Sequence, residues 1–430
     1  MKVLVIGSGG REHAICWKLA QSSNVEKVFC LPGNPGISLE KKCESLSEQI
    51  DYQSETGRNR VVEIALNHGV DITIVGPEEP LVYGIVDDFR QKGLQIIGPE
   101  KDAARLEGSK DFAKVFMAKY GVRAPFSKTV DNYEKACEGI EQLSRFPIVI
   151  KADGLAAGKG VYICSSEGEA KTAADELMNR EKFGESGKRI LIEEYLEGEE
   201  VSILALTDSK VIVPLLSSKD HKRLLEDDKG PNTGGMGVIA PNPVMTDEVY
   251  DDFINAILNP TLKGVKAFGF DYRGIIFFGL MVKDKKCYLL EYNVRMGDPE
   301  TQTILPLMAS DLAEHFLHVE KSRLDETLIK WHPGCCVNLV LASDGYPNLY
   351  KKGKLIADYD HAHVQEISKV FFAGVGLKNE SDLINTGGRV LSVSSIGDDL
   401  ESARSKAYKA ITNITLEGSF YRKDIGLAKG

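Results

Sequence analysis

The sequence predicts an α/β protein of several domains, with a doubly wound parallel sheet near the N-terminus and a small α+β domain at the C-terminal end. Its 430 residues are too many for one hydrophobic core, so two to four domains are expected. Near the N-terminus, short apolar strands each run into a glycine or proline turn, as they do in open parallel sheets. Near the C-terminus, several strands are followed by one long helix, which is typical of an α+β domain.

The composition excludes several classes of protein. A net charge of −10 argues against a nucleic-acid-binding face, which needs a basic surface. No apolar run approaches 18 residues, so nothing is expected to span or bind a membrane. The start of the chain lacks the pattern of a signal peptide, and a cytoplasmic location is therefore expected. Eight cysteines without a Cys-x-x-Cys pair indicate buried thiols rather than a disulfide framework or a zinc site.

The first strand, Lys2–Ile6, runs into a turn that contains three glycines, Gly7, Gly9 and Gly10, and a helix-like stretch follows. Glycines let the backbone approach an anion, and the helix N-terminus offers free N–H groups to it. A dinucleotide-binding fold is the obvious alternative. However, Glu12 stands where that motif has its third glycine, and the next strand, Val25–Leu31, does not end in an acidic residue. Arg11 in the turn suits a monophosphate better.

Two further strands, Val70–Val75 and Leu94–Ile97, also end in Gly-Pro turns. Ligands of open α/β sheets bind outside such carboxyl ends. Glu79, which follows the first of these strands, is therefore a candidate to bind a sugar hydroxyl or an amine, although a solvated loop carboxylate would look the same.

The middle of the chain carries a glycine-rich loop. A predicted helix, Asp102–Tyr120, contains Ser109-Lys110-Asp111, and a strand, Pro147–Lys151, then leads through the loop to a strand at Val161–Cys164. The loop joins two strands and does not open a helix, so it fails the Walker pattern. A hairpin loop that covers phosphates explains both its glycines and its lysines. Lys151 ends an apolar strand, where an unpaired ammonium would be costly, which favours a phosphate partner.

Two more strands, Ile190–Tyr195 and Val201–Thr207, flank a turn that could present backbone groups to an adenine and a carboxylate to a ribose. The stretch Ser217–Gly237 has no strong periodicity, which suggests an ordered loop that lines a site.

The most informative stretch is the strand predicted at Tyr288–Arg295, which pairs with a preceding strand at Gly274–Val282. With a period of two, Glu291, Asn293 and Arg295 share one face. Carboxylate and amide oxygens are ligands that suit Mg²⁺, and a guanidinium beyond them can hold a phosphoryl oxygen. The other face is apolar and is predicted to enter the core through Tyr288, Leu290, Tyr292 and Val294.

After a helix predicted at Ala309–Val319, the C-terminal region begins beyond Pro333. It has three predicted strands and one helix, and these place the α+β domain at Val337–Ala342, Lys369–Phe372, Arg389–Ser394 and Leu400–Asn413.

Taken together, these motifs resemble the phosphoribosylamine–glycine ligase (glycinamide ribonucleotide synthetase) family of ATP-grasp enzymes over essentially the whole chain. The segments that carry the resemblance are Gly7–Ala14, Ile74–Val82, Leu106–Asp111, Ile148–Val161, Asp220–Arg223, Gly230–Gly237, Glu291–Gln302 and Arg422–Gly426. The resemblance implies an N-terminal Rossmann-like domain at 1–102, an ATP-grasp domain at 103–325 with a mobile lid at about 123–192, and a C-terminal α+β domain at 326–430.

The resemblance also implies roles for individual residues. Mg²⁺ or Mn²⁺ would be held by Glu291 and Asn293 alone, since Gly274–Val282 has no carboxylate. ATP would be bound by Lys110, Lys151, Gly154, Gly158, Lys159, Gly160, Glu193, Glu194, Leu196 and Glu200. Phosphoribosylamine would lie at Gly9, Gly10, Arg11, Glu12 and Glu79. The glycine and acyl-phosphate end would be formed by Asp220, Lys222, Gly234, Gly235, Met236, Arg295 and Asp298. The catalytic residues would be Arg295, Lys151 and Asp298.

The implied reaction joins glycine to 5-phosphoribosylamine at the expense of ATP, through glycyl phosphate, and gives glycinamide ribonucleotide, ADP and phosphate. This is the second step of de novo purine biosynthesis. The expected partners are these small molecules alone, with the chain a monomer. Three alternatives stay open: an ATP-grasp enzyme that activates formate or bicarbonate, an NAD-dependent oxidoreductase built on the first turn, and a binding protein without activity.

Overall fold

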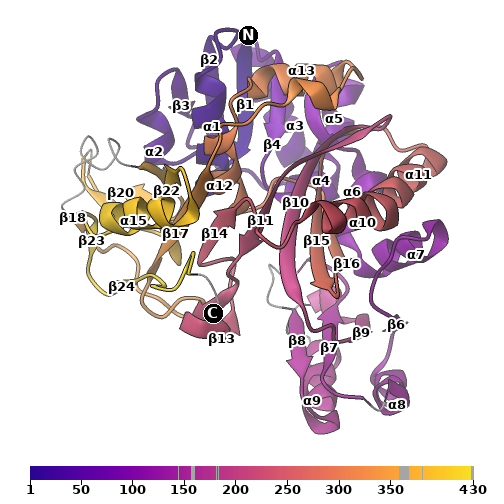
Figure 1. Ribbon diagram of the computed structural model, residues 1–430. Helices are drawn as coiled ribbons and strands as arrows, with labels where there is room; N and C mark the ends of the chain where they lie inside the picture. The colour runs from indigo at the N-terminus through magenta and orange to yellow at the C-terminus, as the bar shows by residue number, and fades with distance from the viewer. Residues whose placement is uncertain are drawn as a thin grey trace.

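The computed structural model describes residues 1–143, 145–155, 160–180, 182, 184–357, 368–379 and 381–427. A sheet of 14 strands runs through the N-terminal, central and C-terminal parts of the chain. A separate four-stranded sheet with two helices projects from this body (Figure 1). The large sheet therefore joins the three parts, and the small one forms an appendage beside it.

The N-terminal part is a doubly wound unit. Its five parallel strands lie in the order β5–β4–β1–β2–β3. The strands are β1 (Lys2–Gly7), β2 (Lys27–Pro32), β3 (Cys43–Ser45), β4 (Ile72–Val75) and β5 (Ile96–Pro99). The helices are α1 (Gly10–Ala20), α2 (Pro35–Ser38), α3 (Glu55–His68), α4 (Glu78–Tyr83), α5 (Ile85–Gln91), α6 (Lys101–Gly108) and α7 (Lys110–Tyr120).

Alternation along β1 explains why helices cover both faces of this sheet. Leu4 and Ile6 belong to a core shared with α3 and α5. Val3 and Val5 point to the opposite face and belong to a core shared with α1 and with α13 (Leu312–Glu320). Strands that are apolar on both faces are typical of parallel sheets covered on both sides. The predicted fold class is thus confirmed.

The central part is antiparallel. Strand β15 pairs with β5 and so extends the N-terminal sheet, and it also pairs with β10 and β16. The strands are β10 (Glu199–Asp208), β11 (Ile212–Asp220), β12 (Arg223–Leu225), β13 (Lys229–Asn232), β14 (Gly237–Ala240), β15 (Tyr272–Lys283) and β16 (Lys286–Asn293). The helical segments are η2 (Glu226–Asp228), α10 (Asp247–Phe253), η3 (Ile254–Leu258), α11 (Asn259–Phe268), α12 (Glu300–Leu307) and η4 (Glu326–Leu328).

The appendage has its own small core. Its strands lie in the antiparallel order β6–β9–β7–β8, and the apolar faces of two helices pack on them. Its elements are β6 (Ser127–Val130), α8 (Tyr133–Leu143), β7 (Ile148–Ala152), β8 (Val161–Cys164), α9 (Glu167–Met178), η1 (Gly184–Gly187) and β9 (Ile190–Glu194). The predicted glycine-rich loop connects β7 to β8 in sequence, and residues 156–159 of it lie outside the described residues.

The C-terminal part packs helix α15 (Leu400–Ile411) against β17 (Cys335–Ser343) and β22 (Arg389–Gly397). Strand β17 also pairs with β14, so this part continues the large sheet. The remaining strands are β18 (Ile356–Ala357), β19 (Lys369–Phe372), β20 (Val375–Leu377), β21 (Leu383–Asn385), β23 (Thr415–Leu416) and β24 (Ser419–Phe420).

The prediction for the strand at Tyr288–Arg295 needs correction. Gly279 pairs with Glu291 and Leu280 pairs with Leu289, so Leu290 is an extra residue, a β-bulge, opposite them. At the bulge, the alternation of side chains between the two faces of the strand moves by one residue. Before it, Cys287 and Leu289 are buried, and after it, Tyr292 and Val294 are buried. Tyr288 and Leu290 therefore leave the core face to which a simple period of two assigned them.

The predicted helix Asp102–Tyr120 is two helices. Ser109 has extended backbone angles (φ −140°, ψ 113°), and its side chain accepts a hydrogen bond from the Phe112 amide as the N-cap of α7. The chain turns there, which brings Lys110 to the start of a new helix. The helix predicted at Ala309–Val319 begins later, at Leu312, because Asp311 caps it.

The stretch Ser217–Gly237 is more regular than predicted. It contains the end of β11 and the two-stranded hairpin β12–β13. Several of its residues do line the cavity described below.

Across the described ranges, no helix is both long and apolar enough to cross a membrane.

The core face of β16 generates a prediction about stability. The Thr261 hydroxyl donates to the Ile257 carbonyl at 2.7 Å, so the buried Tyr292 hydroxyl donates to Thr261 Oγ1 at 2.6 Å. Tyr292→Phe removes this hydrogen bond and should lower the free energy of unfolding by about 1 kcal/mol. Urea unfolding followed by circular dichroism measures it. Tyr288→Phe, on the half-buried side of the same strand, is the matched control, and equal stability of the two variants would contradict the prediction.

Candidate active site

A cavity of about 680 Å³ lies where the appendage, the central strands and the C-terminal part meet. Its lining includes Lys151 from β7, Glu291 and Asn293 from β16, Arg11 from the N-terminal turn, and Arg389 from β22. Residues from every part of the chain thus share one space. Sites between domains are the usual place for small-molecule binding.

Three lysines surround one end of the cavity. Lys151 Nζ lies 2.6 Å from Glu193 Oε2, and Lys114 Nζ lies 2.9 Å from Glu193 Oε1. Burial alone would raise the pKa of Glu193, but the two ammonium groups outweigh it and hold that pKa below its ordinary value. Lys110, one helical turn before Lys114, lines the same wall. These three lysines therefore share two carboxylates, Glu193 and Glu291, which leaves positive charge for an anionic ligand.

The entry of the glycine-rich loop is fixed to the start of α7. The Asp111 amide donates to Asp153 Oδ1 at 2.8 Å, and Lys110 Nζ donates to the Gly154 carbonyl at 3.1 Å. Arg189 Nη1 lies 2.8 Å from Asp111 Oδ2 and ties β9 to the same point. Burial lowers the pKa of Lys110, and Glu291 opposes that effect. Two predicted loop residues, Gly158 and Lys159, lie outside the described residues.

The wall of the cavity between the two sheets is apolar. It is formed by side chains of β7, β8, β15 and β16, namely Val149, Ile163, Met281 and Leu290. The bulge in β16 turns Leu290 toward this space. The link from β9 to β10, with Glu194 and Leu196, closes one side. The Glu194 carboxylate accepts from the Phe126 amide at 2.8 Å, so that carboxylate is already engaged within the appendage.

Glu291 and Asn293 face the cavity two residues apart on β16. Burial alone would raise the pKa of Glu291, but Lys222, Lys151, Lys110 and Arg295 outweigh it and keep that pKa below its ordinary value. A carboxylate and an amide oxygen are the hard donors that Mg²⁺ prefers, and Mg²⁺ usually takes one or two protein ligands and leaves the rest to phosphates and water. The donor chemistry of this pair therefore fits a magnesium ion.

Arg295 follows β16, and its guanidinium contacts side chains of α4, α6 and β16. Its Nη2 lies 3.0 Å from Glu107 Oε1 and donates to Asn293 Oδ1 at 3.2 Å, and its Nε lies 3.3 Å from Glu78 Oε2. Glu107 also accepts from the Val294 amide at 2.7 Å. Burial raises the pKa of Glu107 to about 7, with Arg295 opposing and Glu78 adding to the effect.

The glycine turn after β1 is capped by the residue that replaces the third glycine of a dinucleotide motif. Glu12 accepts from the Gly9 amide at 2.6 Å and pairs with Arg11 Nε at 2.5 Å. The Glu12 carboxylate thus closes the first turn of α1. Arg11 Nη1 donates to the Met296 carbonyl at 3.1 Å, which places this turn beside the end of β16.

Asp298 is held by α12 and by the C-terminal part. Gln302 Nε2 donates to Asp298 Oδ1 at 2.8 Å, and Arg389 Nη1 donates to the Asp298 carbonyl at 2.9 Å. Arg389 also donates to the Gly234 carbonyl. One guanidinium from β22 thus connects two of the segments predicted at the substrate end.

Asp220 is the most unusual carboxyl of the site. Its Oδ1 is buried and has no hydrogen-bond partner among the residues that the structure describes. Burial raises its pKa well above the ordinary value, and Glu300 adds to the effect. Gly235 has φ +105°, and a Cβ there would lie 2.6 Å from Asp220 Oδ1, so the turn needs a glycine. Beside it, Lys222 Nζ lies 2.8 Å from Glu200 Oε2.

Most predicted site residues meet in this cavity. Those that line it are Arg11, Lys110, Lys151, Gly160, Glu193, Glu194, Leu196, Glu200, Asp220, Lys222, Gly234, Glu291, Asn293, Arg295 and Asp298. Those outside its lining are Gly9, Gly10, Glu12, Glu79, Gly154, Gly235 and Met236. Glu79 accepts from Gln53 at 3.1 Å, whereas its neighbour Glu78 contacts Arg295.

The sequence interpretation missed four charged residues: Glu78, Glu107, Lys114 and Arg389. Lys114 had a usable signal, because it follows Lys110 by four positions and so shares its helix face. The other three lie far in sequence from the groups they contact.

The raised pKa of Glu107 predicts how stability depends on pH. The pKa rises from 4.5 to about 7 in the folded chain, so the folded state holds an extra proton between these values and loses stability as the pH rises through them. Glu107→Gln cannot titrate. Its stability relative to the wild type should therefore be greater at about pH 8 than at about pH 5, by up to about 3 kcal/mol. Urea unfolding of the variant and the wild type at both pH values measures this effect. If the difference in their free energies of unfolding is the same at both pH values, the prediction is wrong.

Family comparisons agree along the whole chain. Three family descriptions match: "Phosphoribosylglycinamide synthetase, N domain" at residues 1–107, "ATP-grasp (A) domain" at 108–301 and "C domain" at 336–428. The phosphoribosylamine–glycine ligase of Clostridium acetobutylicum is 49% identical, with 100% of both chains covered. That of Fusobacterium nucleatum is 48% identical, with 99% of this chain and 98% of the relative covered.

Solved structures show the same relationship. The phosphoribosylamine–glycine ligase of Thermotoga maritima superposes with a TM-score of 0.84 at 34% identity, covering 99% of this chain and 100% of that one. The biotin carboxylase domain of Hydrogenobacter thermophilus 2-oxoglutarate carboxylase, solved with MgADP, ADP and bicarbonate, has a TM-score of 0.72 at 16% identity, with 97% and 91% covered. The latter shows a shared fold only. On the full-length identities, the chain belongs to the phosphoribosylamine–glycine ligase family of ATP-grasp enzymes.

Proposed function

We propose that the chain joins glycine to 5-phosphoribosylamine and converts ATP to ADP and phosphate, as a step of purine biosynthesis. The observation that carries the proposal is the single cavity in which Glu291 and Asn293 lie between the lysine cluster and the end formed by Asp220, Lys222 and Arg295. Full-length relatives at 48–49% identity carry the name of this activity.

ATP would enter between the two sheets. Its base would occupy the apolar wall beside Glu193–Leu196, and its phosphates would face Lys110 and Lys151. The loop residues Gly154, Gly158, Lys159 and Gly160 would close over the phosphates, as a lid formed by about 123–192. Glu200 is the proposed ribose ligand, and it now pairs with Lys222, so nucleotide binding would compete with that ion pair.

Glu291 and Asn293 would hold Mg²⁺, or Mn²⁺, beside the phosphates. When bound, such an ion neutralises the charge that develops on the phosphoryl oxygens. The chain's own cations contribute to the same end. Lys151, Lys222 and Arg295 surround Glu291, and their charges would stabilise the transferring phosphoryl group without any protein nucleophile.

Glycine would be activated first, because a carboxylate is a poor acyl donor to an amine. Its carboxylate oxygen would attack the γ-phosphorus of ATP, which gives glycyl phosphate and releases ADP. Arg295 can bind the carboxylate or the acyl phosphate bidentately. Asp220, whose Oδ1 has no hydrogen-bond partner among the described residues, would accept a hydrogen bond from the ammonium group of glycine. Asp298 would sit at the same end, held by Arg389.

Phosphoribosylamine would bind from the N-terminal side. The amides at the start of α1, with Gly9, Gly10 and Arg11, would hold its phosphate, and the phosphate would replace Glu12 as the acceptor for the Gly9 amide. Arg11 and Arg295 both donate to the Met296 carbonyl, so the sugar end and the acyl end are neighbours. The amine would attack the acyl carbonyl of glycyl phosphate and release phosphate. Holding the two reactants together supplies much of the acceleration.

The same proposal includes the division of the chain into domains at 1–102, 103–325 and 326–430, and a monomeric state. Both rest on the family resemblance and on the cavity, which residues of one chain line.

The acid specificity has a direct test. Release of phosphate from ATP is measured with phosphoribosylamine present and with glycine, formate or bicarbonate added in turn. Glycine alone should stimulate release, because Asp220 offers a partner only to an acid that also carries an ammonium group. Stimulation by formate or bicarbonate, without glycine, would overturn the proposed reaction in favour of another ATP-grasp activity.

A variant tests the metal site. Glu291→Gln should lower turnover by at least about 100-fold, because an amide at this position is a weaker ligand for a divalent cation. The far-UV circular dichroism spectrum should stay that of the wild type. Glu401→Gln, an exposed carboxylate at the start of α15, is the control. Near-normal turnover in Glu291→Gln would remove this residue from the metal site.

A further inference from the structure

The end of the chain contacts a hairpin that lines the cavity. We name the segment of β12, η2 and β13 the 223–232 hairpin. Arg422 Nη1 donates to the Arg223 carbonyl at 2.9 Å, across 199 positions of sequence. Figure 1 shows the C-terminal end of the chain beside β13. Because Arg223, Asp228 and Asn232 line the cavity, this contact joins the C-terminal segment to the wall of the site.

The hairpin has little of its own to hold it in place. Its two strands form a sheet of two, apart from the large sheet. Its turn places Asp227 and Asp228 in left-handed backbone conformations, with φ of 58° and 53°. Most of its residues are exposed. A two-stranded hairpin is at best marginally stable alone, so its order depends on outside contacts.

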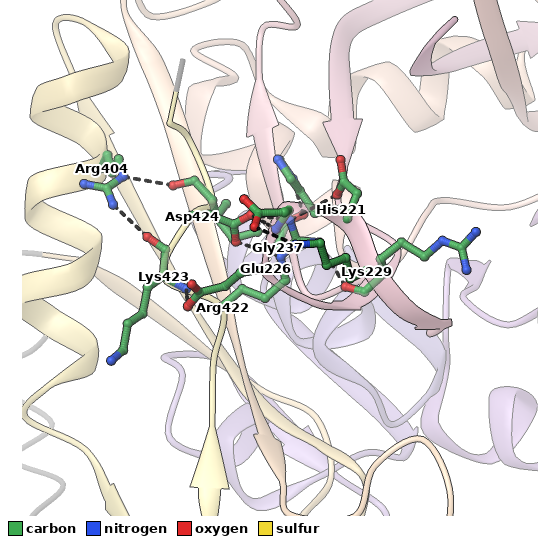
Figure 2. A network of polar contacts seen from close by, with 12 residues as sticks. His221, Glu226, Lys229, Gly237, Arg404, Arg422, Lys423 and Asp424 are labelled. Carbon is green, nitrogen blue, oxygen red and sulfur yellow. Dashed lines mark hydrogen bonds and ion pairs between the residues drawn. The ribbon is translucent and has the colours of Figure 1, made fainter. Parts of the chain in front are cut away.

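Arg422 supplies those contacts. It is 3% exposed, and its Nη2 lies 3.0 Å from Asp228 Oδ1. Asp424 fixes the guanidinium with two hydrogen bonds, at 2.8 and 2.6 Å, and accepts from the Asp227 amide at 3.0 Å. The Lys423 amide donates to Glu226 Oε1 at 3.2 Å. Figure 2 shows this network between the C-terminal segment and the hairpin turn.

The other side of the C-terminal segment is fixed to α15. Arg404 donates to the carbonyls of Lys423 and Ile425, at 2.7 and 3.1 Å. Tyr408 donates to the Arg422 carbonyl at 2.8 Å and accepts from the Ile425 amide at 3.1 Å. Ile425 itself is fully buried in the C-terminal core. The segment is therefore a rigid bridge from the core of one domain to the wall of the cavity.

The hairpin connects two segments of the proposed glycine end. It begins directly after Lys222, and the Thr233 amide and hydroxyl both donate to the Lys222 carbonyl at 2.8 Å. Gly234 follows, with its carbonyl held by Arg389. A shift of the hairpin would therefore move both Lys222 and Gly234.

We propose that Arg422 is a positioning residue for the glycine end of the cavity, which it orders by holding the 223–232 hairpin against the C-terminal domain. The proposal rests on the proposed ligase function. Loss of Arg422 would loosen Lys222 and Gly234 but leave the lysine cluster at the nucleotide end in place. Glycine would then bind more weakly. Water would also reach the acyl carbonyl and release glycine and phosphate, so ADP would form in excess of ligated product.

The experiment compares Arg422→Ala with Lys423→Ala. Both variants lose one positive charge at adjacent positions. However, the Lys423 side chain is exposed and points away from the hairpin, which it contacts through its backbone (Figure 2). Arg422→Ala should raise KM for glycine about tenfold or more and increase the ratio of ADP to product, because small displacements of positioning groups have such effects. KM for ATP should change much less than KM for glycine, because Lys110, Lys114 and Lys151 are untouched. Arg422→Lys, which keeps the charge, should recover part of the loss.

Hydrogen–deuterium exchange provides a readout that does not depend on activity. The amides of residues 225–230 should exchange at least about tenfold faster in Arg422→Ala, with no change in Lys423→Ala. If Arg422→Ala does not fold, Asp424→Asn weakens the same clamp and takes its place. Unchanged hydrogen exchange in the hairpin would overturn the proposal. So would a folded variant in which both KM for glycine and the ratio of ADP to ligated product are those of the wild type. A wild-type chain that ignores glycine would instead overturn the proposed function, and the exchange result would still report on the hairpin.

Discussion

Ion pairs between different parts of the chain tie the walls of the cavity together. Arg295, after β16, pairs with Glu107 of α6 and Glu78 of α4. Lys114 of α7 pairs with Glu193 of β9 in the appendage. Breaking a buried pair by removing one partner typically costs about 3–5 kcal/mol, since a buried charge is left without compensation. The site and the packing of the domains therefore depend on the same contacts.

This arrangement explains which part of the molecule could be predicted from sequence. The four strands predicted near the N-terminus, with their apolar runs and glycine turns, are local features, and they appear as β1, β2, β4 and β5 with ends shifted by up to two residues. The short strand β3 was not predicted. The faces of β16 could not be assigned by counting, because the bulge at Leu290 arises from pairing with Gly279 and Leu280. The break at Ser109 left a local signal, a serine able to cap a helix, inside a stretch that reads as one helix.

The candidate site divides in the same way. Residue types within one motif, such as Glu291 and Asn293, indicated their chemistry directly. Arg389 had no such signal, because its importance comes from its contacts with Asp298 and Gly234, which are distant in sequence. Glu12 shows a third case. The sequence showed only that it breaks a dinucleotide pattern, and the structure gives the reason, since its carboxylate caps the turn where that motif has a glycine.

The two ends of the cavity differ in how their charges are satisfied, and the difference supports the orientation of substrates proposed above. At one end, Lys110, Lys114 and Lys151 face two carboxylates, Glu193 and Glu291, so the net charge is positive and favours a polyphosphate. At the other end, the buried Asp220 lacks a partner among the described residues and has Glu300 nearby, so a cationic group is favoured there. Glycine carries one charge of each sign. In the proposed complex, with the ammonium group of glycine at Asp220, its carboxylate would face Arg295 and a metal ion held by Glu291 and Asn293, beside which the phosphates of ATP would lie.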